Sequence, residues 1–191
     1  MKQERKQIIL QSLAKLLEVR DAAKITTAIL AKESGITEAG LYRHFPSKRL
    51  IFLELFAYCD ETIFFKVGEI KKDEAITPQE KARLIFFFFL IFIEKNKGFA
   101  RILSREALSP NEKNVIDAVN QFYERLELSI KQILAENKEN INLTAGLNAH
   151  LVVTTLEGII SRFIRNGFKE TPSTYIESYW DILAASIFKQ R

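Results

Sequence analysis

The fold is decided by the stretch Ile25-Thr26-Thr27-Ala28-Ile29-Leu30-Ala31-Lys32-Glu33-Ser34-Gly35-Ile36-Thr37-Glu38-Ala39-Gly40-Leu41-Tyr42-Arg43-His44-Phe45. It predicts two short helices joined by a tight turn. Thr26 or Thr27 can cap the first helix and Thr37 the second, because a threonine hydroxyl accepts a hydrogen bond from a free amide of the first helical turn. Gly35 suits the left-handed conformation in which many helices end. This is the layout of a helix-turn-helix.

The second helix of this pair should have one buried face. Leu41 and Phe45 lie four residues apart, so both should point to the core. Pro46 ends the helix, and Ser47 can cap the helix that follows. Anchored in this way, the helix leaves its opposite face free for a partner.

The opposite face is short and polar, as a recognition helix must be to reach base edges in the major groove of DNA. Small side chains at Ala39 and Gly40 would let it approach the bases closely, with Glu38 and Arg43 beside them. Hydroxyl, imidazole and ammonium donors around this face can bind phosphates and so fix the register. The candidate DNA-binding residues are Thr26, Thr27, Thr37, Glu38, Ala39, Gly40, Tyr42, Arg43, His44, Ser47 and Lys48.

Charge is concentrated at the same end of the chain. Residues 1–50 contain ten Lys or Arg and five Asp or Glu, whereas the other 141 residues contain 18 basic and 19 acidic groups. A basic end on a nearly neutral body suits a polyanionic partner. A solvated basic face would give the same composition, so the charge supports the motif but does not identify the partner.

Further helices are predicted on both sides of this stretch. Apolar residues recur at helical spacing, and the polar stretches 71–79 and 140–146 are expected to be loops. With the two short helices this makes an all-α fold of about nine helices, in which residues 1–50 form a DNA-binding domain and residues 51–191 a helical dimerisation and partner-binding domain. The predicted longer helices cover residues 3–20, 48–70, 80–96, 98–108, 110–137, 147–166 and 173–189.

The composition argues against several other functions. Cys59 is the only cysteine, so one chain can form no disulfide framework or cysteine-based metal site. His44 has no suggested nucleophile nearby, and His150 lies without metal-ligand spacing, so packing, phosphate or interface roles are favoured. No glycine-rich phosphate loop or pair of catalytic carboxylates occurs. We expect no enzyme activity, no metal and no cofactor.

The apolar segments indicate a core and not a membrane span. The longest apolar run, residues 84–93, is ten residues long, well below the roughly 18 that a span needs. The N-terminus lacks a secretory signal, so a cytosolic location is expected. The run Phe86-Phe87-Phe88-Phe89 could line an effector pocket, but plain core is favoured, in a helix that is buried on all sides. Glu157 and Arg162 are expected to make polar contacts in a dimeric four-helix bundle.

Residues 25–27 and 41–48 closely resemble the DNA-binding signature of the TetR family of bacterial regulators, above all in Tyr42-Arg43-His44-Phe45-Pro46-Ser47-Lys48. This resemblance implies a three-helix DNA-binding head on an all-helical domain. It also implies a homodimer, formed through the two C-terminal helices, that binds palindromic double-stranded DNA with one head on each half-site. An ordinary member would be a transcriptional repressor that a small hydrophobic effector releases from DNA, and it would need a roomy apolar cavity.

Segments 38–48, 94–103, 121–126 and 157–165 are similar to one branch of this family, the nucleoid occlusion factors. That resemblance implies a nucleoid-associated protein that inhibits the division protein FtsZ when bound to DNA. Asn96 matches the branch, whereas Lys66 and Lys95 stand where arginines are expected, which keeps the charge but loses bidentate geometry. Ile91 stands where a glycine is expected and Tyr58 where a phenylalanine is. The candidate partner-binding residues are Tyr58, Lys66, Phe88, Ile91, Lys95 and Asn96.

Overall fold

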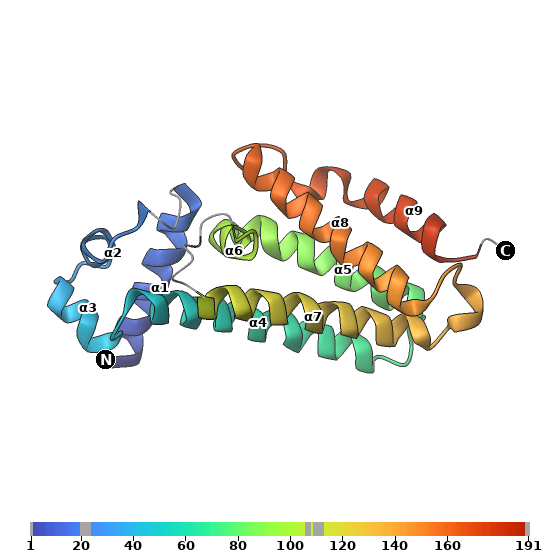
Figure 1. Ribbon diagram of the computed structural model, residues 1–191, viewed down its shortest axis with the longest axis horizontal. Helices are drawn as coiled ribbons and strands as arrows, with labels where there is room; N and C mark the ends of the chain where they lie inside the picture. The colour runs from blue at the N-terminus through green and yellow to red at the C-terminus, as the bar shows by residue number, and fades with distance from the viewer. Residues whose placement is uncertain (1, 20–23, 106–107, 109–112, 190–191) are drawn as a thin grey trace. The chain divides into compact units, whose positions relative to one another are not determined.

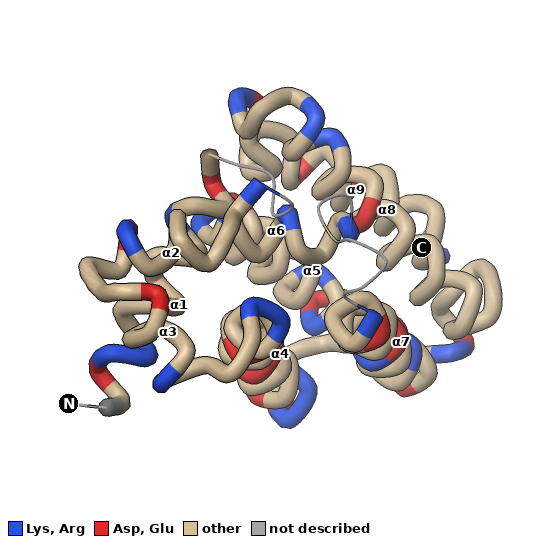
Figure 2. Tube along the Cα trace, turned by 60° about the vertical axis from the view of Figure 1, so that its left-hand side comes forward, with Lys and Arg blue, Asp and Glu red and all other residues tan. Residues whose placement is uncertain are grey.

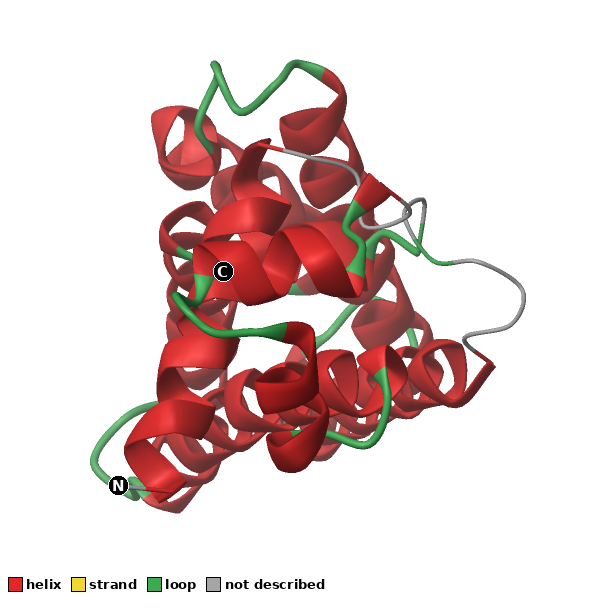
Figure 3. Cartoon of the chain, turned by 90° about the vertical axis from the view of Figure 1, so that its left-hand side faces the viewer, coloured by secondary structure: helices red, strands yellow, loops and turns green. Residues whose placement is uncertain are grey.

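A computed structural model describes residues 2–19, 24–105, 108 and 113–189. These residues form nine α-helices and two 3-10 helices (Figure 1), and the expected all-α class is confirmed. No strand occurs among them (Figure 3); Ile141 and Phe188 form a single antiparallel bridge. In chain order the helices are α1 (Lys2–Val19), α2 (Thr27–Glu33), α3 (Glu38–His44), α4 (Lys48–Lys72), α5 (Pro78–Lys95), α6 (Lys97–Leu103), α7 (Lys113–Ala135), η3 (Lys138–Asn140), α8 (Ala145–Arg165), η4 (Pro172–Tyr175) and α9 (Ile176–Ile187).

The chain divides into two compact units, and α4 and α7 each contribute to both. The first unit comprises residues 1–61 and 96–120, and the second comprises residues 62–95 and 121–191. The boundary expected after residue 50 falls inside α4. The functional division of the chain into residues 1–50 and 51–191 stays a prediction. No described helix combines the length and the apolar character needed to cross a membrane.

The first unit is organised around α1. Ile9, Leu13 and Leu17 recur every four residues along this helix and are almost completely buried. α1 packs against α2, α3 and α6. Phe56 of α4 contacts Phe99 of α6, with ring centroids 5.6 Å apart. The apolar stripe of α1 therefore forms the core on which the helix-turn-helix rests.

Gly98 lets α6 lie very close to α1. A Cβ atom built at this position would lie 2.7 Å from the backbone oxygen of Ala14 and 3.1 Å from the Cβ of Leu17. The first distance is too short for a carbon and an oxygen that are not bonded. Glycine is therefore needed here because two helix backbones meet, and not because of a turn.

Aromatic side chains form much of the core of the second unit. Phe89 of α5 stacks on Phe122 of α7 with centroids 5.8 Å apart, and Phe86 lies 5.8 Å from Trp180 of α9. Phe86, Phe89 and Phe122 are completely buried. Phe87 is only half-buried. The expectation of plain core is thus right for one face of α5 and wrong for the other, which no element among the described residues fully covers.

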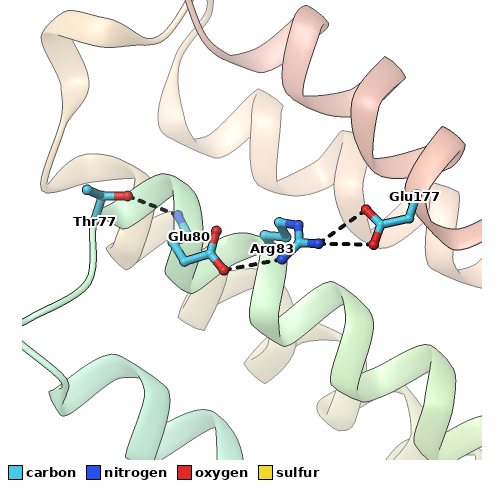
Figure 4. A network of polar contacts seen from close by, with 4 residues as sticks. All are labelled: Thr77, Glu80, Arg83 and Glu177. Atoms are coloured by element: carbon cyan, nitrogen blue, oxygen red, sulfur yellow. Dashed lines mark hydrogen bonds and ion pairs between the residues drawn. The ribbon is translucent and has the colours of Figure 1, made fainter.

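An ion-pair network links α5 to α9 (Figure 4). Arg83 donates through Nη2 to both carboxylate oxygens of Glu177, at 3.1 and 3.2 Å, and through Nη1 to Glu80 at 3.3 Å. The hydrogen bond to Glu177 raises the pKa of Arg83. The guanidinium carbon also lies 4.3 Å from the ring centroid of Phe87. This network fixes the start of α9 on the partly exposed side of α5.

Two helix ends differ from the sequence expectation because of local backbone chemistry. α5 begins at Pro78 and not at Glu80, since the Thr77 hydroxyl accepts the Glu80 amide at 3.2 Å and proline suits a first helical turn. α6 ends at Leu103, five residues earlier than expected. The chain leaves the helix there, and Arg105 adopts a φ of 61°.

The last helix, α9, also starts later than the periodicity indicated, whereas α8 starts at Ala145, two residues earlier than expected. Residues 172–175 form the 3-10 helix η4, so α9 begins at Ile176 and not at Ser173. α7 is described from Lys113 onward, and the start expected at residue 110 lies outside the described residues.

Polar residues of α8 find partners within the chain. Arg162 donates to Oε2 of Glu170 at 3.0 Å, and this contact lowers the pKa of Glu170. His150 Nδ1 lies 3.2 Å from Oε2 of Glu127 on α7, with its side chain exposed. Arg162 therefore has an ion-pair partner within its own chain. A dimer contact at Glu157 stays a prediction.

Candidate nucleic-acid interface

Each helix of the helix-turn-helix begins at a threonine cap. The Thr26 hydroxyl accepts a hydrogen bond from the Ile29 amide at 3.2 Å, and the Thr37 hydroxyl accepts one from the Gly40 amide at 3.1 Å. Thr26 is thus the cap of α2, and Thr27 is its first helical residue. Both caps satisfy amides that would otherwise lack a partner.

The turn between α2 and α3 is closed by backbone hydrogen bonds. Gly35 has a φ of 66°, a conformation that costs glycine little, and the Ile36 amide donates to the Ala31 carbonyl at 3.0 Å. The Ser47 hydroxyl accepts the Leu50 amide at 3.4 Å, as expected for the start of α4. The angle between the two short helices is therefore set by local contacts.

Three apolar side chains fix α2 and α3 to the core. Leu30, Leu41 and Phe45 are at most 2% exposed. The Phe45 amide donates to the Leu41 carbonyl at 2.9 Å and closes the end of α3. The predicted inward face of α3, with Leu41 and Phe45, is therefore confirmed.

The candidate DNA-binding residues lie on or around the opposite face of α3. Tyr42 is 48% exposed, and Arg43 is exposed. Figure 2 shows basic segments near α3 and at the start of α4, together with acidic ones. The exposed candidates are Thr26, Thr37, Glu38, Ala39, Tyr42 and Arg43, and the half-buried ones are Thr27, Gly40, His44, Ser47 and Lys48.

Some candidates also support the local structure. The Thr27 hydroxyl donates to Oε2 of Glu38 at 3.4 Å, joining the starts of α2 and α3. A Cβ at Gly40 would lie 3.3 Å from the Thr37 hydroxyl oxygen, so glycine keeps this cap unstrained. Nδ1 of His44 is buried and has no hydrogen-bond partner among the described residues.

Two lysines lie over aromatic rings at the end of α3 and the start of α4. Lys6 of α1 donates to both carboxylate oxygens of Glu54 on α4, at 3.1 and 3.2 Å, and its ammonium lies 4.9 Å from the centroid of Phe45. The Lys48 ammonium lies 5.3 Å from the centroid of Phe52. Lys48 was predicted from the sequence as a site residue, whereas the Lys6–Glu54 pair was not. Its two members are 48 positions apart, and no periodicity connects them.

The candidate partner-binding residues separate into two places. Lys66, Phe88 and Ile91 line an open groove of about 540 Å³ between α4 and α5, within the second unit. Lys66 pairs there with Glu69 at 3.1 Å. Ile91 is 40% exposed at the groove.

The other three candidates belong elsewhere. Tyr58 and Asn96 line a different hollow of about 320 Å³, within the first unit. Lys95 is exposed and lines neither hollow. This separation could not be predicted from the sequence, because it depends on how helices far apart in the chain pack.

Family comparisons cover most of the chain. Residues 9–55 match the bacterial regulatory proteins of the tetR family. Residues 79–188 match the tetracyclin repressor-like C-terminal domain of the SlmA-like type. The first match contains the helix-turn-helix, and the second covers α5 to α9.

Relatives with the name nucleoid occlusion factor SlmA match along nearly the whole length. The relative from Vibrio campbellii is 38% identical, and the relative from Aliivibrio fischeri is 40% identical, each with 97% of both chains covered. The relative from Vibrio cholerae is 38% identical over 96% of this chain and 95% of its own.

Solved structures show the same fold at low identity. NalD of Pseudomonas aeruginosa, a repressor of a multidrug efflux pump, superposes with a TM-score of 0.80 at 14% identity, covering 99% of this chain and all of its own. FadR of Bacillus subtilis, bound to stearoyl-CoA, gives 0.74 at 16% identity, covering 95% of this chain and 98% of its own. At these identities the likeness concerns the fold alone.

Proposed function

This chain belongs to the TetR family of bacterial regulatory proteins and is a relative of the nucleoid occlusion factor SlmA, and from that premise we propose how its own residues act. It binds palindromic double-stranded DNA as a homodimer and, when bound, blocks assembly of the division protein FtsZ over the nucleoid. It is a DNA-binding regulator of the nucleoid occlusion type that acts by binding and not by catalysis. Its place in the cell is the cytoplasm, on the chromosome.

The observation that carries the DNA-binding proposal is the exposed face of α3. Leu41 and Phe45 fix one side of this seven-residue helix, and Arg43 stands exposed on the other. A helix presented in this way fits the major groove, where an arginine can bind the O6 and N7 atoms of guanine. Tyr42 and Lys48 are proposed to bind phosphates on either side of the groove.

Dimerisation is proposed to use a stripe of exposed residues on α8 and α9. Leu147 and Leu151 of α8 are 52% and 38% exposed, and Ile182 of α9 is 68% exposed. Gly158, also exposed, continues the stripe along α8 with nothing within 4 Å of its Cβ position. Large apolar side chains at helical spacing on two neighbouring elements are typical of a helix-bundle interface.

The groove between α4 and α5 is the proposed binding place for FtsZ. It combines apolar side chains, Phe88 and Ile91 among them, with the ion pair of Lys66 and Glu69 on its edge. Such a groove offers apolar contact for anchoring side chains and charge for orientation. The bulk of Ile91 and the lysine at position 66 shape its specificity.

The test uses purified dimer, FtsZ and a duplex taken from a genome-wide binding map. FtsZ polymers are sedimented with the protein alone, the duplex alone and both together. Sedimented FtsZ should fall only when both are present. No DNA-dependent effect would contradict the nucleoid occlusion proposal, while DNA binding itself would still be measured by fluorescence anisotropy.

A matched pair of variants separates the groove from the DNA-binding head. Ile91→Glu places a charge in the groove, and Leu128→Glu makes the same change at a 51% exposed position on α7. Both should bind the duplex normally, but only Ile91→Glu should lose the effect on FtsZ. Equal effects of the two variants would remove the groove from the proposal.

A further inference from the structure

The hollow of the first unit lies between α1, α4 and α6. Its floor is apolar: Leu55, Cys59 and Phe99 line it and are 7%, 4% and 2% exposed. Gln7 and Gln11 of α1 also line the hollow and are exposed at its rim. A floor of this kind with a few polar groups around it is the usual composition of a small-molecule site.

No side chain that lines this hollow carries a charge at neutral pH. The polar groups are carboxamides, from Gln7, Gln11 and Asn96, and the hydroxyl of Tyr58, all of which can donate and accept hydrogen bonds. Burial raises the pKa of the Cys59 thiol to about 12, so the thiol stays protonated. A charged ligand would therefore lose water here without gaining a counter-ion.

A neighbouring hollow of about 290 Å³ shows the contrast. It shares Gln7 and Tyr58 with the first, but it also contains the Lys6–Glu54 ion pair and Glu61. Ionised side chains thus line this second hollow, whereas none lines the first. The neutrality of the first hollow distinguishes it from the surface beside it.

We propose that the hollow between α1, α4 and α6 binds a neutral, flat small molecule of about two fused rings that carries one amide or hydroxyl group. Its volume of about 320 Å³ is roughly twice that of a cavity that holds benzene. The rings would lie on the apolar floor, and the polar group would face the carboxamides of the rim. This site shares no residue with the exposed face of α3 or with the groove between α4 and α5, although it contains Tyr58 and Asn96 of the candidate partner-binding set. A small-molecule ligand here goes beyond the proposed function.

Three isosteric probes test the required charge: 2-naphthamide, which is neutral, 2-naphthoate, an anion, and 2-naphthamidine, a cation. Calorimetric titration of the full-length dimer should show saturable binding of 2-naphthamide, at least tenfold tighter than binding of either charged probe. Equal affinities of the three probes, or no saturable binding of 2-naphthamide, would overturn the proposal.

Cys59 reports where the probe binds, because it is the only cysteine in the chain. Alkylation by N-ethylmaleimide, followed by mass spectrometry, should slow at least threefold when 2-naphthamide saturates the protein. Binding of 2-naphthamide with an unchanged alkylation rate would place the probe elsewhere and reject this site.

Two changes at an exposed rim position test the geometry without touching the core. Gln11→Trp should fill the hollow and weaken 2-naphthamide binding at least tenfold, while Gln121→Trp, the same change at an exposed position on α7, should leave it unaltered. Gln11→Glu should instead reverse the preference in favour of 2-naphthamidine. If Gln11→Trp binds 2-naphthamide as well as Gln121→Trp does, or if Gln11→Glu keeps the original preference, the proposal is wrong.

Discussion

Lys48 and Lys6 keep their long side chains partly ordered, because aromatic rings and a carboxylate lie within reach of their ammonium groups. The ammonium of Lys48 lies 5.3 Å from the centroid of Phe52, and that of Lys6 contacts Glu54. A flexible lysine loses side-chain entropy when it binds a phosphate. For Lys48 part of that cost is already met in the free protein, so its contact with a phosphate should be more favourable than that of an unrestrained lysine.

Lys48→Ala should therefore weaken binding to every duplex sequence to a similar degree. The slope of log affinity against log salt concentration should fall by about one, since one phosphate contact is lost. Fluorescence anisotropy at several salt concentrations measures the slope. Lys131→Ala, which removes an exposed lysine from α7, is the control and should leave the slope as it is. An unchanged slope in Lys48→Ala would contradict a phosphate contact.

The raised pKa of the Cys59 thiol predicts how the stability of the protein depends on pH. Its pKa is raised by burial from 9.0 to about 12, whereas the thiol of the unfolded chain ionises near its ordinary value. The stability that this difference provides is present below that ordinary value and is lost as pH rises toward the folded pKa. Between pH 8 and 10.5 the wild-type chain should lose roughly 1–2 kcal/mol more than Cys59→Ala does. Urea unfolding at the two pH values measures this, and equal losses would count against the shifted pKa.

The two helices of the helix-turn-helix could be predicted from the sequence, because the residues that begin and end them are close in sequence. The caps at Thr26 and Thr37 and the turn at Gly35 act within four residues. The same rule applied to Thr77 and Pro78 would have located the start of α5, but the surrounding polar residues favoured a loop. The two faces of α5 could not be told apart, because all its central residues are apolar.

The close approach of α6 to α1 at Gly98 predicts how a larger side chain there would change stability. Gly98→Ala should destabilise the protein by about 1–3 kcal/mol, because the added methyl group meets the backbone of Ala14 at 2.7 Å. Gly68→Ala is the matched control: nothing lies within 4 Å of its Cβ position, so it should stabilise α4 by about 0.5–1 kcal/mol. Denaturant unfolding compares them. Similar unfolding midpoints for the two variants would contradict the close approach.

Several contacts that stabilise the fold or line its hollows join residues far apart in sequence. Arg83 and Glu177 are separated by 94 positions, and the hollow beside Cys59 draws on three helices. Binary patterning shows that such helices have buried faces, but it does not say which faces meet. The family resemblance supplied the recognition surface, whereas the ion-pair network and both hollows required the structure.

The proposed dimer interface makes a prediction about assembly. Ile182→Glu places a charge on the exposed stripe of α9, so the dimer should dissociate at micromolar concentration while the single chain stays folded. Duplex affinity should fall strongly, because two linked heads bind far more tightly than one. Leu128→Glu is the control and should remain dimeric. Sedimentation velocity gives the assembly state, and a dimeric Ile182→Glu would exclude this stripe.

Because Cys59 is buried, the protein should resist oxidation. The chain contains only two sulfur atoms, in Met1 and Cys59, and the thiol is 4% exposed. A protonated, hidden thiol reacts slowly with peroxide and with glutathione disulfide. A cell that experiences an oxidant burst should therefore retain this regulator in working form, because oxidants would leave its only thiol unmodified.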